Sequence, residues 1–424
     1  MASSKEKAQK ALHVIDKVHG IEKLAETLRD KNNHIPENDS FPTEEMASVS
    51  GKEKRLDYLK KYANAEPFYL TGKKSFSDFE SLKGNIENFI GMTMVPTGII
   101  GPLRVLGTVA QGDYFVPLAT SEGALVASYH RGAKATRLSG GVTSVCLVEG
   151  VQRSPVFSFN DVGTAIQFLS FVYQSEDNIR AVVAAKSRFA TLEDIRSNVE
   201  GNHLIITFEF HTGDAAGQNM VTICTDAVCR YLVENSPVKP VNWYIEGNYS
   251  GDKKATALSF TTVRGKKVVA ECSIPRIIVE KVLKTTPEAM ADYWQTSTLG
   301  VIQSGAIGAQ GHVANGLTAL FLATGQDVAC VAEAAVGITR MQITEDGGLY
   351  TSVTLPNLIV GTVGGGTGLP TQKECLEMMG CAGAGHARKF AEIAAAVALS
   401  GEISIAAALS AGHFAGAHQK FGRK

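Results

Sequence analysis

The sequence carries almost no net charge, which limits the classes of partner that it can bind. Its 424 residues include 41 Lys or Arg and 42 Asp or Glu, and the formal net charge is −1. A chain without a basic excess lacks the electrostatic signature of a dedicated nucleic-acid-binding protein. Hydrophobic residues make up 44% of the chain, so a large core is possible and intrinsic disorder of the whole chain is excluded.

The sequence also lacks closely spaced pairs of cysteines. The 7 cysteines are dispersed and odd in number, and none belongs to a CxxC pair. This spacing argues against a disulfide framework and against a zinc site, so we predict free thiols, no bound metal and a cytoplasmic location. The first ten residues, MASSKEKAQK, contain no apolar run of the kind found in secretory signals, and no such signal is expected here.

One long stretch without charge tests whether the chain enters a membrane. Between residues 293 and 326 there is no Asp, Glu, Lys or Arg. A lipid-exposed span tolerates few polar groups. This stretch nevertheless contains Gln303, Ser304, Gln310, His312 and Asn315. We therefore predict helices that are buried in a large core, and no membrane partner.

The order of hydrophobic patterns predicts an α+β fold in three parts. Residues 1–80 are expected to form a small N-terminal helical domain, because their apolar residues recur at helical spacing. Residues 156–249 have the pattern strand, helix, strand, helix, which is typical of a ferredoxin-like unit. The flanking residues 81–155 and 250–424 alternate strands with long Ala-rich helices, and we assign them to one large domain.

Two acidic residues stand at the ends of apolar segments. Glu122 lies where the strand DYFVPLAT turns into a helix expected to begin near Ser121. A half-buried carboxyl group there has a raised pKa and donates a proton near neutral pH, whereas an exposed one is an ordinary first-turn glutamate. Asp327 follows the uncharged helix NGLTALFLATGQ, where it is either a polar helix end or a buried carboxylate coupled to a Lys or Glu partner. The residues alone leave both choices open.

Basic candidates lie in two further segments. Lys253 and Lys254 follow Asp252 in the loop GNYSGDKK. A lysine there stabilises a developing oxyanion, or it belongs to a solvated charged turn. His413 and His418 lie five residues apart in SAGHFAGAH, so neither helical metal-binding spacing applies. A histidine at this place protonates a leaving group or is merely exposed.

Glycine is abundant, with 42 residues, and two Gly-rich segments have the composition for close approach to a ligand. GTVGGGTGLP, residues 361–370, does not match the fingerprint GxGxxG, so a Rossmann fold is not predicted. Its backbone either approaches a phosphate or ring closely or serves only for packing. GDAAGQNM, residues 213–220, would place a helix N-terminus against a pyrophosphate, with an N-cap role for Asp214 as the simpler alternative.

Taken together, these segments resemble the 3-hydroxy-3-methylglutaryl-CoA (HMG-CoA) reductase family. The resemblance runs from IENFIGMTMVPTGIIGPLRV to the C-terminus, with the motifs in matching order. The matching segments are PLATSEGALVAS, VEGVQR, SRF, GDAAGQNM, GNYSGDKK, HVANGLTALFLATGQD, GTVGGGTG and SAGHFAGAH. The versions GTVGGGT and SGDKK resemble the class I form, which typically uses NADPH.

The resemblance implies both an architecture and a reaction. A large domain with a central helix would bind the CoA thioester, and an inserted ferredoxin-like domain would bind the dinucleotide. The chain would assemble as a dimer or tetramer with its active site between subunits. The implied reaction is the reduction of HMG-CoA to mevalonate and CoA by two hydride transfers from NADPH, with NADH the less expected donor.

The resemblance also assigns four catalytic positions. Lys253 would stabilise the oxyanion that forms when hydride reaches the thioester carbonyl, and Asp327 would bridge Lys253 and Glu122. Glu122 would supply a proton when the aldehyde is reduced, and His418 would protonate the departing CoA thiolate. Asn315 would support this cluster.

Further positions are implied to bind the substrates. Arg153 in VEGVQR matches a contact to the free carboxylate of HMG-CoA, which favours charge-assisted partners. Lys254 in GNYSGDKK matches a second contact, and Asp252 in the same loop is assigned to substrate binding. Positions that meet CoA are matched by Ser128, Arg131 and Lys284. The dinucleotide-binding positions are Ser187, Arg188, Asp214, Asn219, Gly364 and Gly365. Pairing of Arg188 with a 2′-phosphate would favour NADPH.

Departures from the family pattern leave the substrate open. Glu246 replaces a serine that usually contacts the substrate carboxylate, and two carboxylates there would repel unless Arg153 and Lys254 neutralise both. His130 replaces an asparagine near CoA, and residues 330–334 replace a polar run, so the surroundings of the catalytic aspartate are expected to be drier. The alternatives are a reductase of the same fold that acts on a different acyl-CoA, and a catalytically silent protein that only binds CoA or nucleotide.

Overall fold

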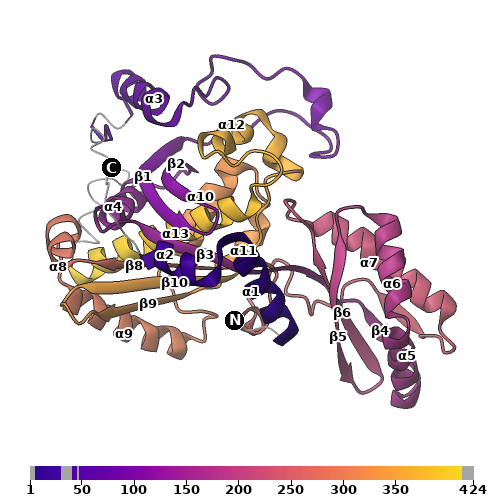
Figure 1. Ribbon diagram of the computed structural model, residues 1–424. Helices are drawn as coiled ribbons and strands as arrows, with labels where there is room; N and C mark the ends of the chain where they lie inside the picture. The colour runs from indigo at the N-terminus through magenta and orange to yellow at the C-terminus, as the bar shows by residue number, and fades with distance from the viewer. Residues whose placement is uncertain (1–4, 30–40, 45–46, 413–424) are drawn as a thin grey trace.

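The computed structural model describes residues 5–29, 41–44 and 47–412, and within them the strands form one 10-stranded sheet. In chain order the strands are β1 (Thr97–Gly107), β2 (Gln111–Ala119), β3 (Val142–Arg153), β4 (Val156–Ser158), β5 (Thr191–Glu200), β6 (His203–His211), β7 (Asn242–Tyr244), β8 (Gly265–Ile274), β9 (Ile338–Ile343) and β10 (Leu349–Leu358). Figure 1 shows the sheet extending from a large part of the molecule into a smaller part on the right.

The helices fall into three groups. The N-terminal helices are α1 (Lys5–His19), α2 (Ile21–Arg29) and α3 (Val49–Ala63). The small part contains α5 (Val162–Gln174), α6 (Glu176–Lys186) and α7 (Gln218–Asn235). The large part contains η1 (Phe79–Leu82), α4 (Leu125–Leu138), η2 (Ala257–Phe260), α8 (Arg276–Ile278), the π-helical η3 (Val279–Leu283), α9 (Pro287–Ser304), α10 (Val313–Thr324), η4 (Val328–Cys330), α11 (Val331–Ala334), η5 (Gly365–Gly368), α12 (Pro370–Met378) and α13 (Ala387–Ser410).

Strand β3 joins the two parts of the sheet. Its first residues pair in parallel with β1, and its middle pairs antiparallel with β8, both in the large part. Its last residues, Val151, Gln152 and Arg153, pair antiparallel with β6 in the small part. Because one continuous strand crosses between the parts, Arg153 at its end stands at their junction.

The small part has the predicted ferredoxin-like topology. Its strands follow the spatial order β5-β6-β4-β7, all antiparallel, and they share a buried cluster with α5, α6 and α7. In chain order this is strand, helices, two strands, helix and strand, the split βαβ arrangement. The sequence patterns missed α6 and β5. Strand β5 is paired only with β6, and its polar residues TLEDIRSNVE lack the alternation of a half-buried strand.

Helix α13 is the central element of the large part. Most of its 24 residues are buried, and it packs against α4, β3, β8 and β10. It is the one described helix whose length and hydropathy would permit a membrane span. Of its most apolar stretch, 89% is buried inside the molecule. The charge-free stretch predicted to be buried forms parts of α9 and α10. Helix α10 is mostly buried as expected, whereas α9 leaves Leu299 and Ile302 exposed.

A buried carboxylate on α13 fixes the hairpin between β1 and β2. Glu392 accepts hydrogen bonds from the backbone amides of Thr108 (3.2 Å), Val109 (3.0 Å) and Ala110 (2.8 Å), and from the Thr108 hydroxyl. The approach is close because Gly107 has no side chain, and a Cβ there would lie 2.2 Å from Glu392 Oε2. These donors would otherwise be unpaired in the core, so one side chain satisfies the whole turn.

The N-terminal helices dock on the rest of the chain. Helix α3 begins after the N-cap Ser48 and buries Tyr58 in a cluster with residues of β2, α10 and α12. Helix α1 reaches the small part, where Lys7 Nζ lies 2.5 Å from Glu209 Oε1. The N-terminal segment therefore contacts both parts of the sheet.

Candidate active site

Lys253 and Asp327 form the ion pair at the centre of the candidate site. Lys253 Nζ lies 3.0 Å from Asp327 Oδ2, and the side chains are 46% and 42% exposed. The hydrogen bond to Asp327 raises the pKa of Lys253, so the lysine keeps its positive charge at neutral pH. Asp327 also caps η4 by accepting the Ala329 amide. It is therefore both a helix-end residue and the partner of a lysine, but it is not buried.

Glu333 and Arg264 lie buried beside this pair. Glu333 Oε1 accepts the backbone N–H of Lys253 at 3.1 Å, and Glu333 Oε2 lies 3.4 Å from Arg264 Nη1. Burial raises the pKa of Glu333 to about 7, although the Arg264 charge acts in the opposite direction. The Arg264 guanidinium also pairs with Asp252 Oδ1 at 2.7 Å and donates to Gln218. Charges this deeply buried are stable only with such partners.

Arg153 holds two carboxylates at the end of β3. Its Nη1 lies 2.9 Å from Asp252 Oδ2 and 3.2 Å from Glu246 Oε2. Burial disfavours the charged form of Asp252, but Arg264 and Arg153 outweigh it and hold the Asp252 pKa below its usual value. Lys254 Nζ donates to the Asp252 carbonyl at 2.9 Å. Glu246 is thus neutralised by Arg153, and the described contacts of Lys254 do not include it.

Asp214 caps the central helix α13 and not α7, the helix that follows it in the sequence. Its two carboxylate oxygens accept the backbone amides of Gly385 (2.7 Å) and Ala387 (3.0 Å) at the N-terminus of α13. Its carbonyl accepts the amide of Thr362 at 2.8 Å, in the second Gly-rich segment along the chain, residues 361–370. Helix α7 follows Gly217, which adopts the left-handed conformation. A carboxylate at a helix N-terminus is favoured because it satisfies amides that have no partner in the helix.

The two Gly-rich segments lie side by side. Ala215 and Val363 form a parallel bridge between them. The second segment then crosses the C-terminal end of α10, where a Cβ on Gly325 would lie 2.2 Å from the Gly366 carbonyl oxygen. Residues 364–365 have φ angles of 76° and 54°, with open space beside their Cα atoms. The backbone of residues 364–365 carries no side chains and lies near the C-terminal end of α10, which Asp327 follows in the chain. It permits close approach of a ligand.

Three other dinucleotide candidates lie on the surface of the small part. Ser187 ends α6, and its hydroxyl accepts the amides of Phe189 and Ala190. Arg188 is exposed, with its guanidinium 4.8 Å from the Phe189 ring centroid. Asn219 is exposed in the first turn of α7. Within the described ranges Arg188 makes no ion pair, so its charge remains available to a ligand, whereas the Ser187 hydroxyl already accepts two amides.

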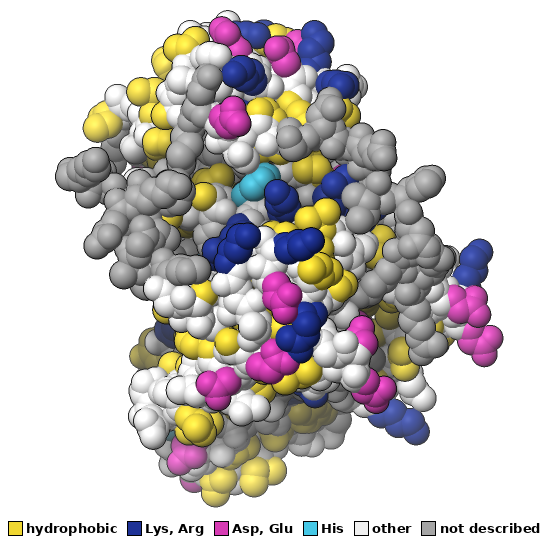
Figure 2. Space-filling view, turned by 90° about the vertical axis from the view of Figure 1, so that its left-hand side faces the viewer, with side chains coloured by type: hydrophobic (Ala, Val, Ile, Leu, Met, Phe, Trp, Pro, Cys, Tyr) yellow, Lys and Arg dark blue, Asp and Glu magenta, His cyan; other side chains and the backbone are white. Residues whose placement is uncertain are grey.

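The candidates for CoA binding gather around the C-terminal half of α13. Arg131 Nη2 donates to the Ser404 carbonyl at 2.6 Å, and Ser128 Oγ donates to Ser404 Oγ at 2.9 Å. Lys284 is exposed and follows η3, which packs on α4. Figure 2 shows the face at this end of the molecule, with basic side chains concentrated near its middle. The three candidates therefore lie on one side of the large part.

Three predicted members of the catalytic cluster are not joined to the ion pair. Glu122 precedes α4, which begins only at Leu125, and its carboxylate makes no hydrogen bond or ion pair within the described ranges. Asn315 lies in the first turn of α10, about 14 Å of helix from the end that leads to Asp327. His418 lies outside the described residues.

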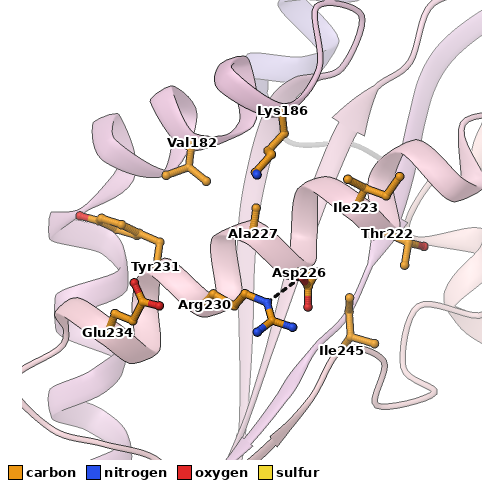
Figure 3. A pocket seen from close by; sticks show the side chains of 10 residues that line it. All are labelled: Val182, Lys186, Thr222, Ile223, Asp226, Ala227, Arg230, Tyr231, Glu234 and Ile245. Carbon is orange, nitrogen blue, oxygen red and sulfur yellow. Dashed lines mark hydrogen bonds and ion pairs between the residues drawn. The ribbon is translucent and has the colours of Figure 1, made fainter.

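A groove of about 650 Å³ lies apart from these residues, between α6 and α7 (Figure 3). Its lining residues are Val182, Lys186, Thr222, Ile223, Asp226, Ala227, Arg230, Tyr231, Glu234 and Ile245. Arg230 Nε lies 2.8 Å from Asp226 Oδ2 along the groove. None of the candidate residues lines this groove. In the part of the chain that is described, no group of three or more His, Cys, Asp or Glu is arranged to hold a metal ion.

The sequence matches one known family over most of its length. The family model of hydroxymethylglutaryl-coenzyme A reductase matches residues 51–423. The chain belongs to this family. The chain is 43% identical over 360 residues to the HMG-CoA reductase of Pyrococcus horikoshii, covering 83% of this chain and 87% of the relative. For the reductase of Methanocaldococcus jannaschii the identity is 42% over 356 residues, covering 82% and 87%.

Solved HMG-CoA reductase structures share the fold. The class II enzyme of Streptococcus pneumoniae, bound to NADPH in open conformations, matches with a TM-score of 0.68 and 20% identity, covering 84% of this chain and 96% of that one. At this identity the similarity concerns the fold alone. It confirms the predicted α+β class, and the curated relatives confirm the resemblance to HMG-CoA reductases, which are oxidoreductases.

The site of this reductase contains two residues that the sequence patterns did not single out. Glu333 lies in the apolar run VACVAEAAVGI, and Arg264 stands directly before the buried strand β8. The available signal for both residues was a single charged side chain next to or within an apolar run. Such a side chain is buried only with a partner of opposite charge. The partner itself was not predictable, since the two residues are 69 positions apart in sequence.

Proposed function

We propose that this HMG-CoA reductase family member reduces HMG-CoA to mevalonate and free CoA and oxidises two NADPH. The observation that carries the proposal is the ion pair between Lys253 and Asp327. It lies between the Arg153 cluster on one side and the bare backbone of residues 364–365 on the other. A fixed positive charge at such a junction is what reduction of a thioester carbonyl requires.

Each candidate residue has its own task in the proposed reaction. A bound reduced dinucleotide supplies the hydride for each of the two reductions. Lys253, held by Asp327, stabilises the oxyanion that develops on the carbonyl oxygen. His418 protonates the CoA thiolate as it leaves, and Glu122 protonates the aldehyde oxygen in the second reduction. Two hydrides and two protons are consumed, as the conversion of a thioester to an alcohol and a thiol requires.

We assign the dinucleotide to the junction of the small part with the second Gly-rich segment. The backbone of residues 364–365 would meet the pyrophosphate, and Asn219, Ser187 and Arg188 would contact the rest of the nucleotide. Asp214, with both oxygens engaged by α13, would position this segment. The fold shared with an NADPH-bound reductase supports a nicotinamide dinucleotide, and the exposed Arg188 is the reason to prefer NADPH.

We further propose that two copies of the chain complete each active site. Within one copy, Glu122 makes no contact with the pair of Lys253 and Asp327 among the described residues. A second copy that placed its Glu122 against this pair would complete the catalytic set.

Exposed apolar residues support the same assembly. The segment before β1 leaves Ile90 and Met94 almost completely exposed, with relative accessibilities of 101% and 93%. Contact with a second copy would remove this apolar surface from water. We propose a dimer or tetramer, with domains at residues 1–80, 156–249, and 81–155 together with 250–424.

CoA is proposed to bind along α4, beside Ser128, Arg131 and Lys284. Positive side chains there would attract the phosphates of CoA. All seven cysteines are buried, which supports reduced thiols in a cytoplasmic environment.

The experiment that tests the function follows the absorbance of reduced nicotinamide during turnover. Purified protein with HMG-CoA is expected to oxidise two NADPH for each mevalonate formed, and to use NADH less well. Oxidation that depends on NADH alone would contradict the cofactor assignment. Binding of CoA or nucleotide without oxidation of either cofactor would indicate the catalytically silent alternative.

A second candidate function is the reduction of a different acyl-CoA. One nitrogen of Arg153 already lies within 3.2 Å of Glu246 and 2.9 Å of Asp252, so an arriving substrate carboxylate meets repulsion there. A panel of acyl-CoAs without the distal carboxylate separates the two functions. Faster turnover of a neutral acyl-CoA than of HMG-CoA would favour the second.

Arg188 provides a prediction on cofactor choice. Arg188→Ala is expected to raise the KM for NADPH by about 10- to 100-fold, because one charge-assisted contact to the 2′-phosphate is lost. The KM for NADH, which lacks that phosphate, should change little. Arg230→Ala is the matched control, because Arg230 is exposed and pairs only with Asp226 among the described residues. An equal rise in KM for both cofactors would contradict the assignment.

A further inference from the structure

Two carboxylates from the short segment of residues 327–333 contact Lys253, one at its ammonium group and one at its backbone amide. Asp327 binds the ammonium group with a separation of 3.0 Å, and Glu333 accepts the backbone N–H at 3.1 Å. The two acids are only six positions apart, on the consecutive helices η4 and α11. The position of the lysine is therefore set at its main chain as well as at its charge.

The main chain of Lys253 needs such a contact. Its φ angle is 57°, in the left-handed region that residues other than glycine rarely adopt. The conformation turns the chain between Asp252, which pairs with Arg153 and Arg264, and the exposed Lys254. Without an acceptor for its amide, the turn would be free to relax and would move the ammonium group away from Asp327.

Glu333 is built into the interior and does not merely rest on the loop. Its side chain is 0% exposed and that of its partner Arg264 is 1% exposed. Burial raises the pKa of Glu333 to about 7, so the protein holds this carboxyl group where its charge is costly. The same Arg264 guanidinium contacts Asp252 and Gln218, the latter being the first residue of α7. Through Arg264, Glu333 thus connects Lys253 to the loop of Asp252 and to the start of α7.

We propose that Glu333 is a positioning residue of the reductase, which fixes the main chain of Lys253 so that its ammonium group faces the reacting carbonyl. The proposal rests on the function proposed above. Glu333 itself touches neither substrate. Its effect is expected in the rate of the chemical step, because a small displacement of a catalytic group lowers kcat much more than it weakens binding.

Two variants separate the backbone contact from the charge. Glu333→Gln keeps an oxygen that accepts the Lys253 amide, and Glu333→Ala removes it. Glu333→Ala is expected to lower kcat by about 10- to 100-fold, with the KM for NADPH changed less than about 2-fold. Glu333→Gln is expected to recover a large share of the lost rate. Glu377→Ala is the control, because Glu377 is 53% exposed on α12 and pairs only with Lys373 in the described chain.

Hydrogen–deuterium exchange provides a readout that needs no turnover. Peptides covering residues 250–256 should exchange faster in Glu333→Ala than in the wild type, and near the wild-type rate in Glu333→Gln, because the Lys253 amide loses its acceptor only in the first. If Glu333→Ala does not fold, the rate and exchange of Glu333→Gln still decide the inference, since both should stay near wild type.

The outcomes are distinguishable. An active wild type with a Glu333→Ala kcat within about 2-fold of it, or with Glu333→Gln as slow as Glu333→Ala, would overturn the positioning role. A wild type inactive on HMG-CoA would refute the proposed function instead. The exchange of residues 250–256 would then judge the inference alone, and unchanged exchange in Glu333→Ala would overturn it.

Discussion

Replacing Lys253 by alanine is expected to lower kcat by about 10²- to 10³-fold or more, because the site loses the charge that we propose stabilises the oxyanion. No other lysine is paired with Asp327 among the described residues, and Lys254 is directed to the Asp252 carbonyl. The KM for HMG-CoA should change far less than kcat, since Lys253 acts mainly in the transition state. Steady-state kinetics with NADPH measure both constants.

Matched variants make the Lys253 result interpretable. Lys373→Ala removes a lysine that is 59% exposed and pairs with Glu377 on the surface, and it should keep wild-type kinetics. Mixing Lys253→Ala with Glu122→Gln subunits should restore part of the activity if each site combines two copies, because one site of each mixed dimer is then intact. A Lys253→Ala enzyme that keeps near wild-type kcat would contradict the mechanism.

Replacing Glu392 by alanine is expected to lower the free energy of unfolding of the large part by about 3–5 kcal/mol. The substitution leaves the amides of Thr108, Val109 and Ala110 without an acceptor in the core. It also creates a cavity at the hairpin, which adds to the cost. Glu392→Gln should lose less, because one oxygen remains to accept some of these bonds.

The two tryptophans allow this effect to be measured in one part of the molecule. Trp294 lies on α9 of the large part, and Trp243 lies on β7 of the small part. In a Trp243→Phe background, urea unfolding followed by Trp294 fluorescence reports the large part alone. Glu377→Ala, at an exposed site, should change the free energy by less than about 0.5 kcal/mol. A loss below about 1 kcal/mol in Glu392→Ala would contradict the assigned role.

Local patterns predicted the elements of this reductase better than they predicted its contacts. The apolar spacing around residues 161–174 and 204–210 was sufficient for a helix and a strand of the small part. The polar edge strand β5 carried no such signal. For Glu122, the strand end was recognised, but the left-handed Ala124 delays the helix to Leu125. Left-handed turns of this kind depend on tertiary packing, which one sequence does not display.

The pairing of Lys253 with Asp327 was expected from the family resemblance and not from spacing, because 74 positions separate the two residues. Asp214 illustrates the opposite case. The sequence suggested an N-cap for the nearest helix, and the residue instead caps α13, which begins at Ala387. Local rules identify the kind of group that an aspartate satisfies, whereas only the fold decides which helix supplies it.

The contacts of Asp214 also determine what can move when the two parts of the molecule rotate relative to each other. This residue belongs by sequence to the small part, yet its carboxylate and carbonyl are attached to α13 and Thr362 of the large part. A rocking motion of β5, α5 and α6 would therefore change the distance from Arg188 to Gly364 while leaving that from Asp214 to Gly364 nearly constant. One end of the proposed nucleotide site would then stay fixed while the other end moves.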